Sequence, residues 1–319
     1  MPQSYKKTSG KPFPQFPENH PVVSLIYLMM LMFIGTIVFG LISILLIILM
    51  GNGIEGLPEI LSGQSPDLIP IRIIQTFSSI GTFIVPAWIL SKIESKRTRY
   101  FSFYRPSSSL LWLSGILIIL VAAPILELSG AINQQLQLPD FLSGVEDWMI
   151  KKEADLKLLT EAMLKGGAYT DLFFNLFMIA LLPAIGEELI FRGMLQNIMA
   201  RWTKNAHLGI WIAAIIFSSI HMQFYGFLPR LLMGALFGYL LFWSKSLWFP
   251  IIAHFINNAI VVIYAFILQK QGASLHALDE PMALHFIWYL LSFGACMAIL
   301  YYFWKYSTYQ NIHHGRPLD

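Results

Sequence analysis

The chain has 319 residues, of which 56% are hydrophobic and only 12% are charged, and its mean hydropathy is +0.62. Soluble globular proteins carry about 25% charged residues, so this composition argues against a soluble enzyme, a disordered chain and a nucleic-acid-binding protein. The net charge of +3 is too small to indicate a polyanionic partner, and the single cysteine, Cys296, excludes an internal disulfide and a multi-cysteine metal site. A polytopic membrane protein remains.

Apolar segments predict how often the chain crosses the membrane. A helix needs about 20 apolar residues to cross the hydrocarbon core of a bilayer, which is roughly 30 Å thick. The pattern predicts an all-α polytopic membrane protein of about eight transmembrane helices that surround a polar cavity. The predicted spans are Val22–Met50, Ile69–Leu90, Leu110–Leu128, Leu172–Met199, Leu208–Met222, Phe227–Trp243, Leu247–Leu268 and Leu284–Trp304. The fifth and sixth spans are short, and the tight segment Gln223–Gly226 separates them.

The spans divide the chain into five regions. These are a cytoplasmic N-terminal tail (1–20), three transmembrane helices (21–128), an outer loop (129–170), a transmembrane core that is the candidate catalytic region (171–268), and a last helix with a cytoplasmic tail (269–319). The second half of the outer loop, Val145–Leu164, mixes apolar and charged residues and predicts an interfacial amphipathic helix. Such a helix would act as a spacer or lid at the membrane surface; a substrate gate is the alternative.

The basic residues predict the orientation of the spans. With the N-terminus in the cytoplasm, 14 of the 21 Lys and Arg residues lie on the inner side and six on the outer side, and Arg72 lies within a span. Most of the acidic residues then fall on the outer side. Because cytoplasmic loops carry an excess of Lys and Arg, we expect both ends of the chain to be cytoplasmic.

Charged residues inside a span are energetically costly and are candidates for a functional site. The fourth span carries Glu187, Glu188 and Arg192. Glu188 and Arg192 are four residues apart on one helix face, so they can neutralise each other. Glu187 points about 100° away from this pair, and an unpaired buried carboxylate can serve as a general base. The alternative is an ion-pair network that holds helices together.

A histidine ends the fifth span. His221 lies as far beyond the turn near Lys204 as Glu187 lies before it. Residues equidistant from the turn of an antiparallel hairpin lie at the same level, so His221 is expected to face Glu187 if both helices stay regular. Pro183 can bend the fourth span and weakens this argument. A hydrogen-bonded structural role for His221 is the alternative.

The sixth and seventh spans carry further signals. His254 and Asn258 are four residues apart on the seventh span, share a face, and can both donate hydrogen bonds, which suits an oxyanion hole. The alternative is that they link membrane helices by hydrogen bonds. On the sixth span, Gly234 and Gly238 form a small-xxx-small pattern that predicts close helix packing.

Three motifs on successive membrane segments resemble a known family. They are Glu187-Glu188-x-x-x-Arg192, Phe217-x-x-x-His221 and His254-x-x-x-Asn258, and in this order they resemble the CPBP family of intramembrane proteases. That family includes the CAAX prenyl endopeptidases and bacterial proteins grouped with abortive-infection and bacteriocin-processing factors. The similar region runs from about Asp171 to Leu268, roughly a third of the chain, and no motif position departs from the family pattern.

The resemblance implies a helical bundle with a water-filled cavity inside the membrane. It also implies a role for each polar residue of the three motifs. The roles are activation of a water by Glu187 with His221, stabilisation of an oxyanion by His254 and Asn258, and support of the site by Glu188 and Arg192.

The resemblance leaves the need for a metal open. Members of the family are often described as metalloproteases, and Glu187, His221 and His254 could supply a zinc ligand set of two histidines and a glutamate. The sequence lacks the H-E-x-x-H helix that is typical of zinc proteases. A metal-free mechanism that uses the glutamate and a histidine is at least as plausible.

The implied function is that of an intramembrane endopeptidase. It would hydrolyse a peptide bond of a membrane-associated or lipidated protein or peptide, in a bacterial inner membrane, with the lipid bilayer and the substrate as partners and no nucleic acid. Two other classes stay open. In a transporter, Glu187, Glu188 and His221 would relay protons, although the sequence shows no internal repeat of the kind many transporters have. In a non-catalytic scaffold, the polar clusters would only hold helices together.

Overall fold

The protein is described by a computed structural model for residues 17–51, 53–65, 67–278 and 284–313, with side chains as far as residue 310. Every regular element in these ranges is helical, which confirms the predicted all-α fold. The α-helices are α1 (Pro21–Leu49), α2 (Leu57–Leu61), α3 (Leu68–Ser79), α4 (Val85–Ile93), α5 (Ser109–Gln134), α6 (Ser143–Leu164), α7 (Tyr169–Asn175), α8 (Leu182–Glu188), α9 (Gln196–Thr203), α10 (Ala206–Ile220), α11 (Phe227–Ser244), α12 (Trp248–Lys270) and α13 (Phe286–His313).

Shorter helical segments connect these helices. Four are 3₁₀-helical, η1 (Ile54–Gly56), η3 (Asp140–Leu142), η6 (Phe224–Gly226) and η7 (Leu275–Leu278), and three are π-helical, η2 (Ile80–Ile84), η4 (Leu176–Leu181) and η5 (Leu189–Leu195). Most of the predicted N-terminal tail and the end of the predicted C-terminal tail lie outside the described residues.

The chain is an integral membrane protein. In its described part, seven helical segments are long and apolar enough to cross a membrane, and they coincide with seven of the eight predicted spans. They are Pro21–Leu49, Leu68–Ile93, Ser109–Gln134, Tyr169–Thr203, Phe224–Ser244, Trp248–Lys270 and Phe286–Gln310. The fifth predicted span, Leu208–Met222, is present as α10, but its 15 residues extend over only about 22 Å. It is too short to cross the hydrocarbon core alone.

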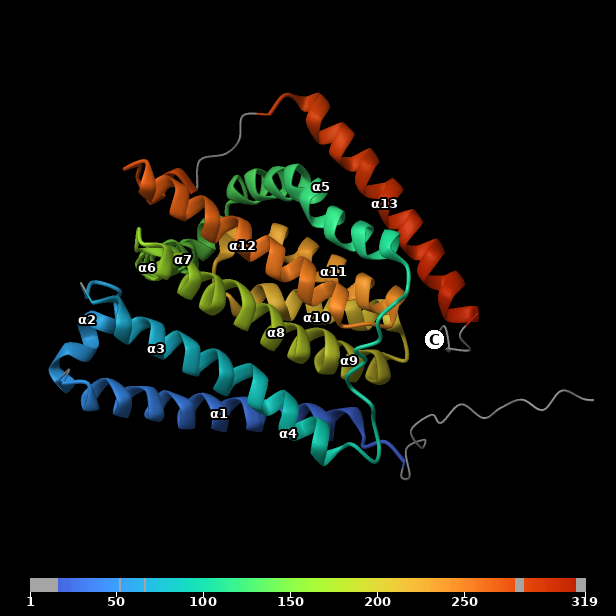
Figure 1. Cartoon of the computed structure of the whole chain (residues 1–319), viewed down its shortest axis with the longest axis horizontal. Coiled ribbons are helices and arrows are strands. Elements are labelled where there is room, and N and C mark those ends of the chain that lie inside the picture. Colours follow the sequence, from blue (N-terminus) through green and yellow to red (C-terminus); the bar gives the residue numbers. More distant parts are fainter. Residues whose placement is uncertain (1–16, 52, 66, 279–283, 314–319) are drawn as a thin grey trace, which may run out of the picture.

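The helices form three layers (Figure 1). Helix α1 lies alongside α3 and α4 on one side of the molecule, and α5 and α13 pack together on the opposite side. Between them lie the long span that contains α7, α8 and α9, and the helices α10, α11 and α12. One buried apolar cluster joins α1 and α4 to α9 and α10, and another joins α5, α11, α12 and α13. The spans with the polar motifs therefore occupy the middle of the molecule.

The fourth span departs from a regular α-helix on both sides of α8. The π-helical segments η4 and η5 flank the two adjacent glutamates, and π-helical turns are frequent at functional sites. Pro183 has no N–H to donate to the carbonyl of Ile179, four residues earlier. The side-chain amide of Asn258 on α12 donates to that carbonyl instead, at 3.2 Å. The irregular span is thus tied to the helix that carries the last motif.

Helices α10 and α11 approach closely at two glycines. A Cβ atom at Gly234 would lie 3.0 Å from the Cβ of Ala214, and one at Gly238 would lie 2.7 Å from the Cγ2 of Ile210. Any larger residue would push the helices apart. This contact confirms the predicted small-xxx-small packing.

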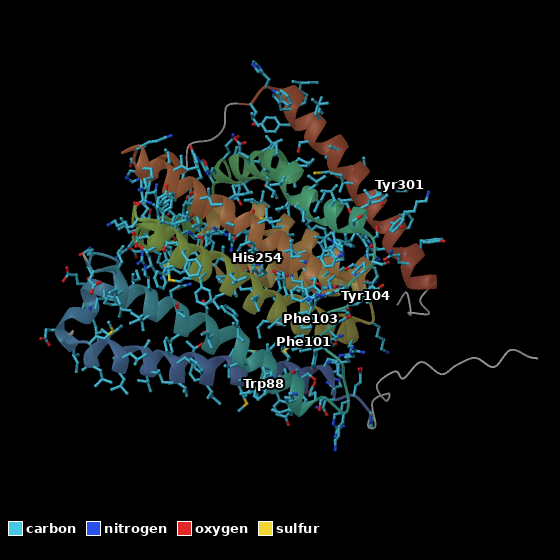
Figure 2. All side chains as sticks on the ribbon, in the orientation of Figure 1. Trp88, Phe101, Phe103, Tyr104, His254 and Tyr301 are labelled. Carbon is cyan, nitrogen blue, oxygen red and sulfur yellow. The ribbon has the colours of Figure 1, made fainter. Side chains whose placement is uncertain are left out.

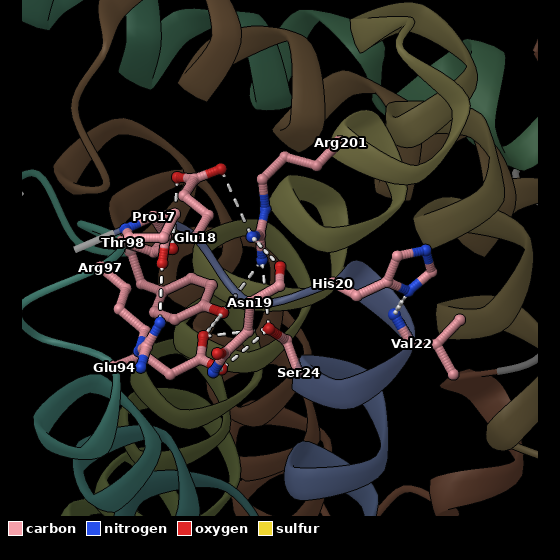
Figure 3. A network of polar contacts seen from close by, with 11 residues as sticks. Pro17, Glu18, Asn19, His20, Val22, Ser24, Glu94, Arg97, Thr98 and Arg201 are labelled. Carbon is pink, nitrogen blue, oxygen red and sulfur yellow. Dashed lines mark hydrogen bonds and ion pairs between the residues drawn. The ribbon is translucent and has the colours of Figure 1, made fainter.

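A buried polar cluster ties the start of α1 to the α4–α5 loop and to α9 (Figure 3). The carboxylate of Glu94 is fully buried and accepts hydrogen bonds from Asn19 at 2.7 Å, from Ser24 at 2.9 Å and from the hydroxyl of Tyr100. Arg201 donates to that hydroxyl at 3.1 Å. Burial and the hydrogen bond to Glu94 raise the pKa of Tyr100 above its ordinary value, so the phenol remains a donor at neutral pH.

The orientation of the bundle stays a prediction that cysteine labelling can test. In a Cys296→Ser background, a cysteine in place of Lys151, which is exposed on α6, should react with a membrane-impermeant maleimide in intact cells. A cysteine in place of Lys96, exposed in the α4–α5 loop, should react only after lysis, because the excess of basic residues keeps that loop cytoplasmic. The reverse labelling pattern would contradict a topology with both ends inside.

Candidate active site

A cavity of about 190 Å³ brings together the polar residues that the three motifs contribute. It lies where α8, the end of α10, α11 and α12 meet, and Figure 2 shows His254 near the middle of the bundle. Its lining residues are Glu187, Phe217, His221, Arg230, Met233, Phe237, His254, Asn257 and Asn258. The four residues predicted to act in catalysis are therefore neighbours, although they come from three helices.

Glu188 joins two of the motifs. Its side chain is fully buried, and its Oε1 accepts a hydrogen bond from Nη1 of Arg192 at 2.6 Å and from Nδ1 of His254 at 2.7 Å. The predicted i,i+4 pair on one helix face is thus present. The proton on Nδ1 of His254 is used in this bond, so Nε2 is the nitrogen turned towards Glu187. The carboxylate of Glu188 is thus the counter-charge of Arg192, and its bond to Nδ1 sets the orientation of the His254 ring.

Aromatic rings hold Arg192 and His254 from the sides. The guanidinium carbon of Arg192 lies 4.5 Å from the ring centre of Phe217 and 5.2 Å from that of Phe237, within cation–π range. Phe237 also stacks on His254, with ring centres 5.4 Å apart. A second donor of Arg192, Nη2, bonds to the carbonyl of Gly234 at 3.3 Å. The Glu188–Arg192 pair is therefore enclosed by protein and does not line the cavity itself.

Glu187 is the acid that faces the cavity. Its Oε2 lies 3.9 Å from Nε2 of His254, beyond direct hydrogen-bond distance. Within the described part of the chain this buried oxygen has no hydrogen-bond partner. Because a buried acceptor needs a partner, the geometry leaves Oε2 of Glu187 available to a group that enters the cavity.

His221 is oriented by its own helix. Its Nδ1 lies 2.7 Å from the carbonyl oxygen of Phe217, one turn earlier. A carbonyl can only accept, so Nδ1 carries the proton and the neutral ring has its lone pair on Nε2. The ring also packs edge-on against Phe217, with centres 4.9 Å apart. His221 and Glu187 line the same cavity, as the hairpin argument predicts, but the chain makes no direct bond between them in the described residues.

The two asparagines of α12 both line the cavity. Nδ2 of Asn257 donates to Oδ1 of Asn258 at 3.1 Å, and Nδ2 of Asn258 donates to the carbonyl of Ile179 at 3.2 Å. The first bond fixes which way the Asn258 amide points. Each amide nitrogen carries a second N–H, so Asn258 can still donate into the cavity. The sequence placed only Asn258 in the site, and the structure adds Asn257 to its lining.

Arg230 is a cavity residue that none of the three motifs contains. It lies in the first turn of α11 and lines the cavity. A basic residue inside the predicted span Phe227–Trp243 was the signal that could have found it, because charges at membrane depth indicate function. Met233 and Phe237, one and two turns further along α11, complete the apolar wall.

The residues present do not fit the zinc set considered from the sequence. Among the described side chains, no three from His, Cys, Asp and Glu stand close enough to hold one metal ion. Nδ1 of His254 and Nδ1 of His221 both form hydrogen bonds within the protein, so Nε2 is the ring nitrogen that each histidine leaves for a ligand.

The region of the chain that contains the site matches a known protein family. Residues 169–260 match the family described as type II CAAX prenyl endopeptidase, Rce1-like. The chain carries an Rce1-like CAAX endopeptidase domain. This Rce1-like domain runs from α7 into α12 and contains every residue of the three motifs, namely Glu187, Glu188, Arg192, Phe217, His221, His254 and Asn258.

A bacterial protein is similar to part of the chain. The chain is 31% identical over 90 residues to a protein of Bacillus subtilis (strain 168) described as "Uncharacterized protein YpbD". The aligned residues are 27% of this chain and 43% of YpbD, so the similarity spans less than half of either protein. Of the solved structures, none matches the chain significantly.

Proposed function

We propose that this protein is an intramembrane endopeptidase that hydrolyses a peptide bond in a membrane-associated or lipidated protein or peptide. One observation carries the proposal. Glu187, His221, His254 and Asn258 line a single cavity, inside a domain of an endopeptidase family. A base, a second proton carrier and hydrogen-bond donors within one small cavity are the parts that amide hydrolysis by an activated water requires.

Glu187 and His221 act on the water in this proposal. The water lies between Oε2 of Glu187 and Nε2 of His221, which are the acceptor atoms these side chains leave unbonded. Glu187 takes one proton while the water oxygen attacks the carbonyl carbon of the scissile bond. The tetrahedral intermediate then collapses, the C–N bond breaks, and the proton passes from Glu187 to the leaving nitrogen. The products are a carboxylic acid and an amine, and the enzyme returns to its starting state.

His254 and Asn258 face the negative charge that develops on the carbonyl oxygen. Asn258 donates its second amide N–H, and Nε2 of His254 donates when both ring nitrogens carry a proton. Their positions are held by neighbouring side chains. Glu188 fixes Nδ1 of His254 at 2.7 Å, and Asn257 fixes the Asn258 amide at 3.1 Å.

Comparative proteomics of membrane fractions tests the proposal. Cells with the wild-type protein and cells with the Glu187→Ala variant are compared at equal protein levels for peptides that begin or end at new positions. Cleavage products that disappear in the variant are expected. Identical sets of termini, together with proton flux by the purified protein in proteoliposomes, would contradict the proposal and favour the transporter.

The two adjacent asparagines should respond differently to replacement by alanine. Asn258→Ala is expected to lower kcat about 10²–10³-fold with little change in KM, because it removes an oxyanion donor. Asn257→Ala removes only the bond that orients the amide of Asn258, so a loss below about tenfold is expected, together with some stability. The measurement is kcat of both variants on one reporter, after each is shown to be folded in detergent. Equal defects would mean that the oxyanion donor has been assigned to the wrong residue.

A further inference from the structure

Arg230 differs from other arginines in the membrane-spanning helices in its lack of a direct ion pair. Arg72 pairs with Asp171 at 2.9 Å, and Arg192 pairs with Glu188 at 2.6 Å. Within the described residues, the hydrogen bonds of Arg230 go to uncharged groups of Gln223. A charge at membrane depth is costly and is retained for a function. Arg230, which has no direct ion pair among the described side chains, lines the proposed catalytic cavity.

The loop after α10 holds the guanidinium of Arg230 in place. Nη1 donates to the backbone carbonyl of Gln223 at 2.9 Å, and Nη2 donates to the side-chain carbonyl of the same residue at 2.5 Å. Gly226 makes room for the group, because a Cβ atom there would lie 2.9 Å from both Nη1 and Nη2. An arginine has five N–H donors, and these bonds use two of them. Three donors are left on a cation whose position is fixed.

Two carboxylates act on this cation from a distance. Glu187 does so from within the cavity, and Glu153 does so from α6, which lies over the loop that holds Arg230. Neither forms a direct ion pair with it in the described residues. The guanidinium therefore has charge compensation through space, while no carboxylate of the described residues bonds to its three remaining N–H groups. Two neighbouring N–H groups of an arginine match the two oxygens of a carboxylate.

We propose that Arg230 binds a carboxylate group of the substrate inside the catalytic cavity. The inference rests on the proposed endopeptidase function and adds a substrate class to it. The carboxylate is either the C-terminus of the substrate or an acidic side chain near the scissile bond, since both present the same two oxygens. Arg230 then selects peptides by charge and places their scissile bond at Glu187.

Three synthetic peptides separate the two sources of the carboxylate. One has a free C-terminus, the second is its C-terminal amide, and the third is the amide with one glutamine near the scissile bond replaced by glutamate. Full-length wild-type protein in detergent should cleave one of the two acidic peptides with a kcat/KM about tenfold or more above that of the plain amide. The Arg230→Gln variant should reduce this ratio to about one. The control variant Lys270→Gln removes an exposed positive charge at the end of α12 and should keep the ratio.

A binding measurement separates this inference from the proposed function. Peptide affinities are measured with the Glu187→Gln variant, which is not required to cleave, and with the Glu187→Gln, Arg230→Gln double variant. Tighter binding of an acidic peptide that is lost in the double variant supports the inference, even if the wild-type protein cleaves none of the three. Equal affinity for all three peptides, or a preference that survives Arg230→Gln, overturns it whether or not cleavage is seen.

Discussion

Replacement of Glu187 by glutamine is expected to lower kcat by about 10²–10⁴-fold while the protein still inserts and folds. Glutamine keeps the shape of the side chain but cannot accept the proton of the attacking water. Oε2 of Glu187 has no hydrogen-bond partner within the described residues, so the change removes no direct hydrogen bond between helices. The measurements are kcat on a cleavable reporter and the thermal midpoint of the purified protein in detergent.

The control for this variant is Glu55→Gln, which neutralises an exposed acid in the α1–α3 connection. It should leave both quantities unchanged. Activity of Glu187→Gln within a few-fold of the wild type would rule out Glu187 as the base. A large fall in the thermal midpoint would show instead that Glu187 supports the fold.

Replacement of Glu188 by glutamine should have the largest effect on stability. The change leaves the guanidinium of Arg192, which is 2% exposed, without its counter-charge. Removal of one partner of a buried ion pair costs about 3–5 kcal/mol of the free energy of unfolding. Activity should fall as well, because Nδ1 of His254 loses the carboxylate that orients its ring. The measurements are unfolding in a denaturing detergent and kcat of the fraction that remains folded.

A double variant distinguishes loss of the pair from loss of one charge. Glu188→Leu combined with Arg192→Met removes both charges and fills their space with apolar atoms, so most of the lost stability should return. Catalysis should not return, since the orientation of His254 still depends on Glu188. A double variant that is less stable than Glu188→Gln would contradict the view that the unpaired guanidinium causes the instability.

Much of this architecture could be predicted from local patterns. The lengths of the apolar runs located the membrane helices to within a few residues, and the i,i+4 spacing of Glu188 and Arg192 predicted their contact. The position of His221 relative to the turn predicted that it would face Glu187, and both residues line one cavity. These inferences needed only the regular geometry of helices and the cost of charge in an apolar environment.

Other features depend on contacts between distant segments. The bond between His254 and Glu188 joins residues 66 positions apart, and no spacing rule predicts it. The π-helical segments on either side of α8 change the register of the fourth span. Pro183 indicates that the helix can bend, but it does not predict where the π-helical turns lie. Arg230 belongs to none of the three motifs, and only its contacts with Gln223 and its place in the cavity wall identify it as part of the site.

Helix α10 is shorter than the hydrocarbon core of a bilayer is thick, and this difference concerns the candidate site because His221 follows the end of α10. The helix would cover about 22 Å of a core that is roughly 30 Å thick, and its apolar side chains Leu208, Trp211, Ile215 and Ile220 are exposed. This hydrophobic mismatch forces the bilayer to thin beside His221 or to admit the polar turn that follows it. Irregular backbone is tolerated at that depth only where it lines a wet cavity or is covered by protein. If the protein hydrolyses its substrate as proposed, lipid chain length should therefore affect how far water must travel to the site.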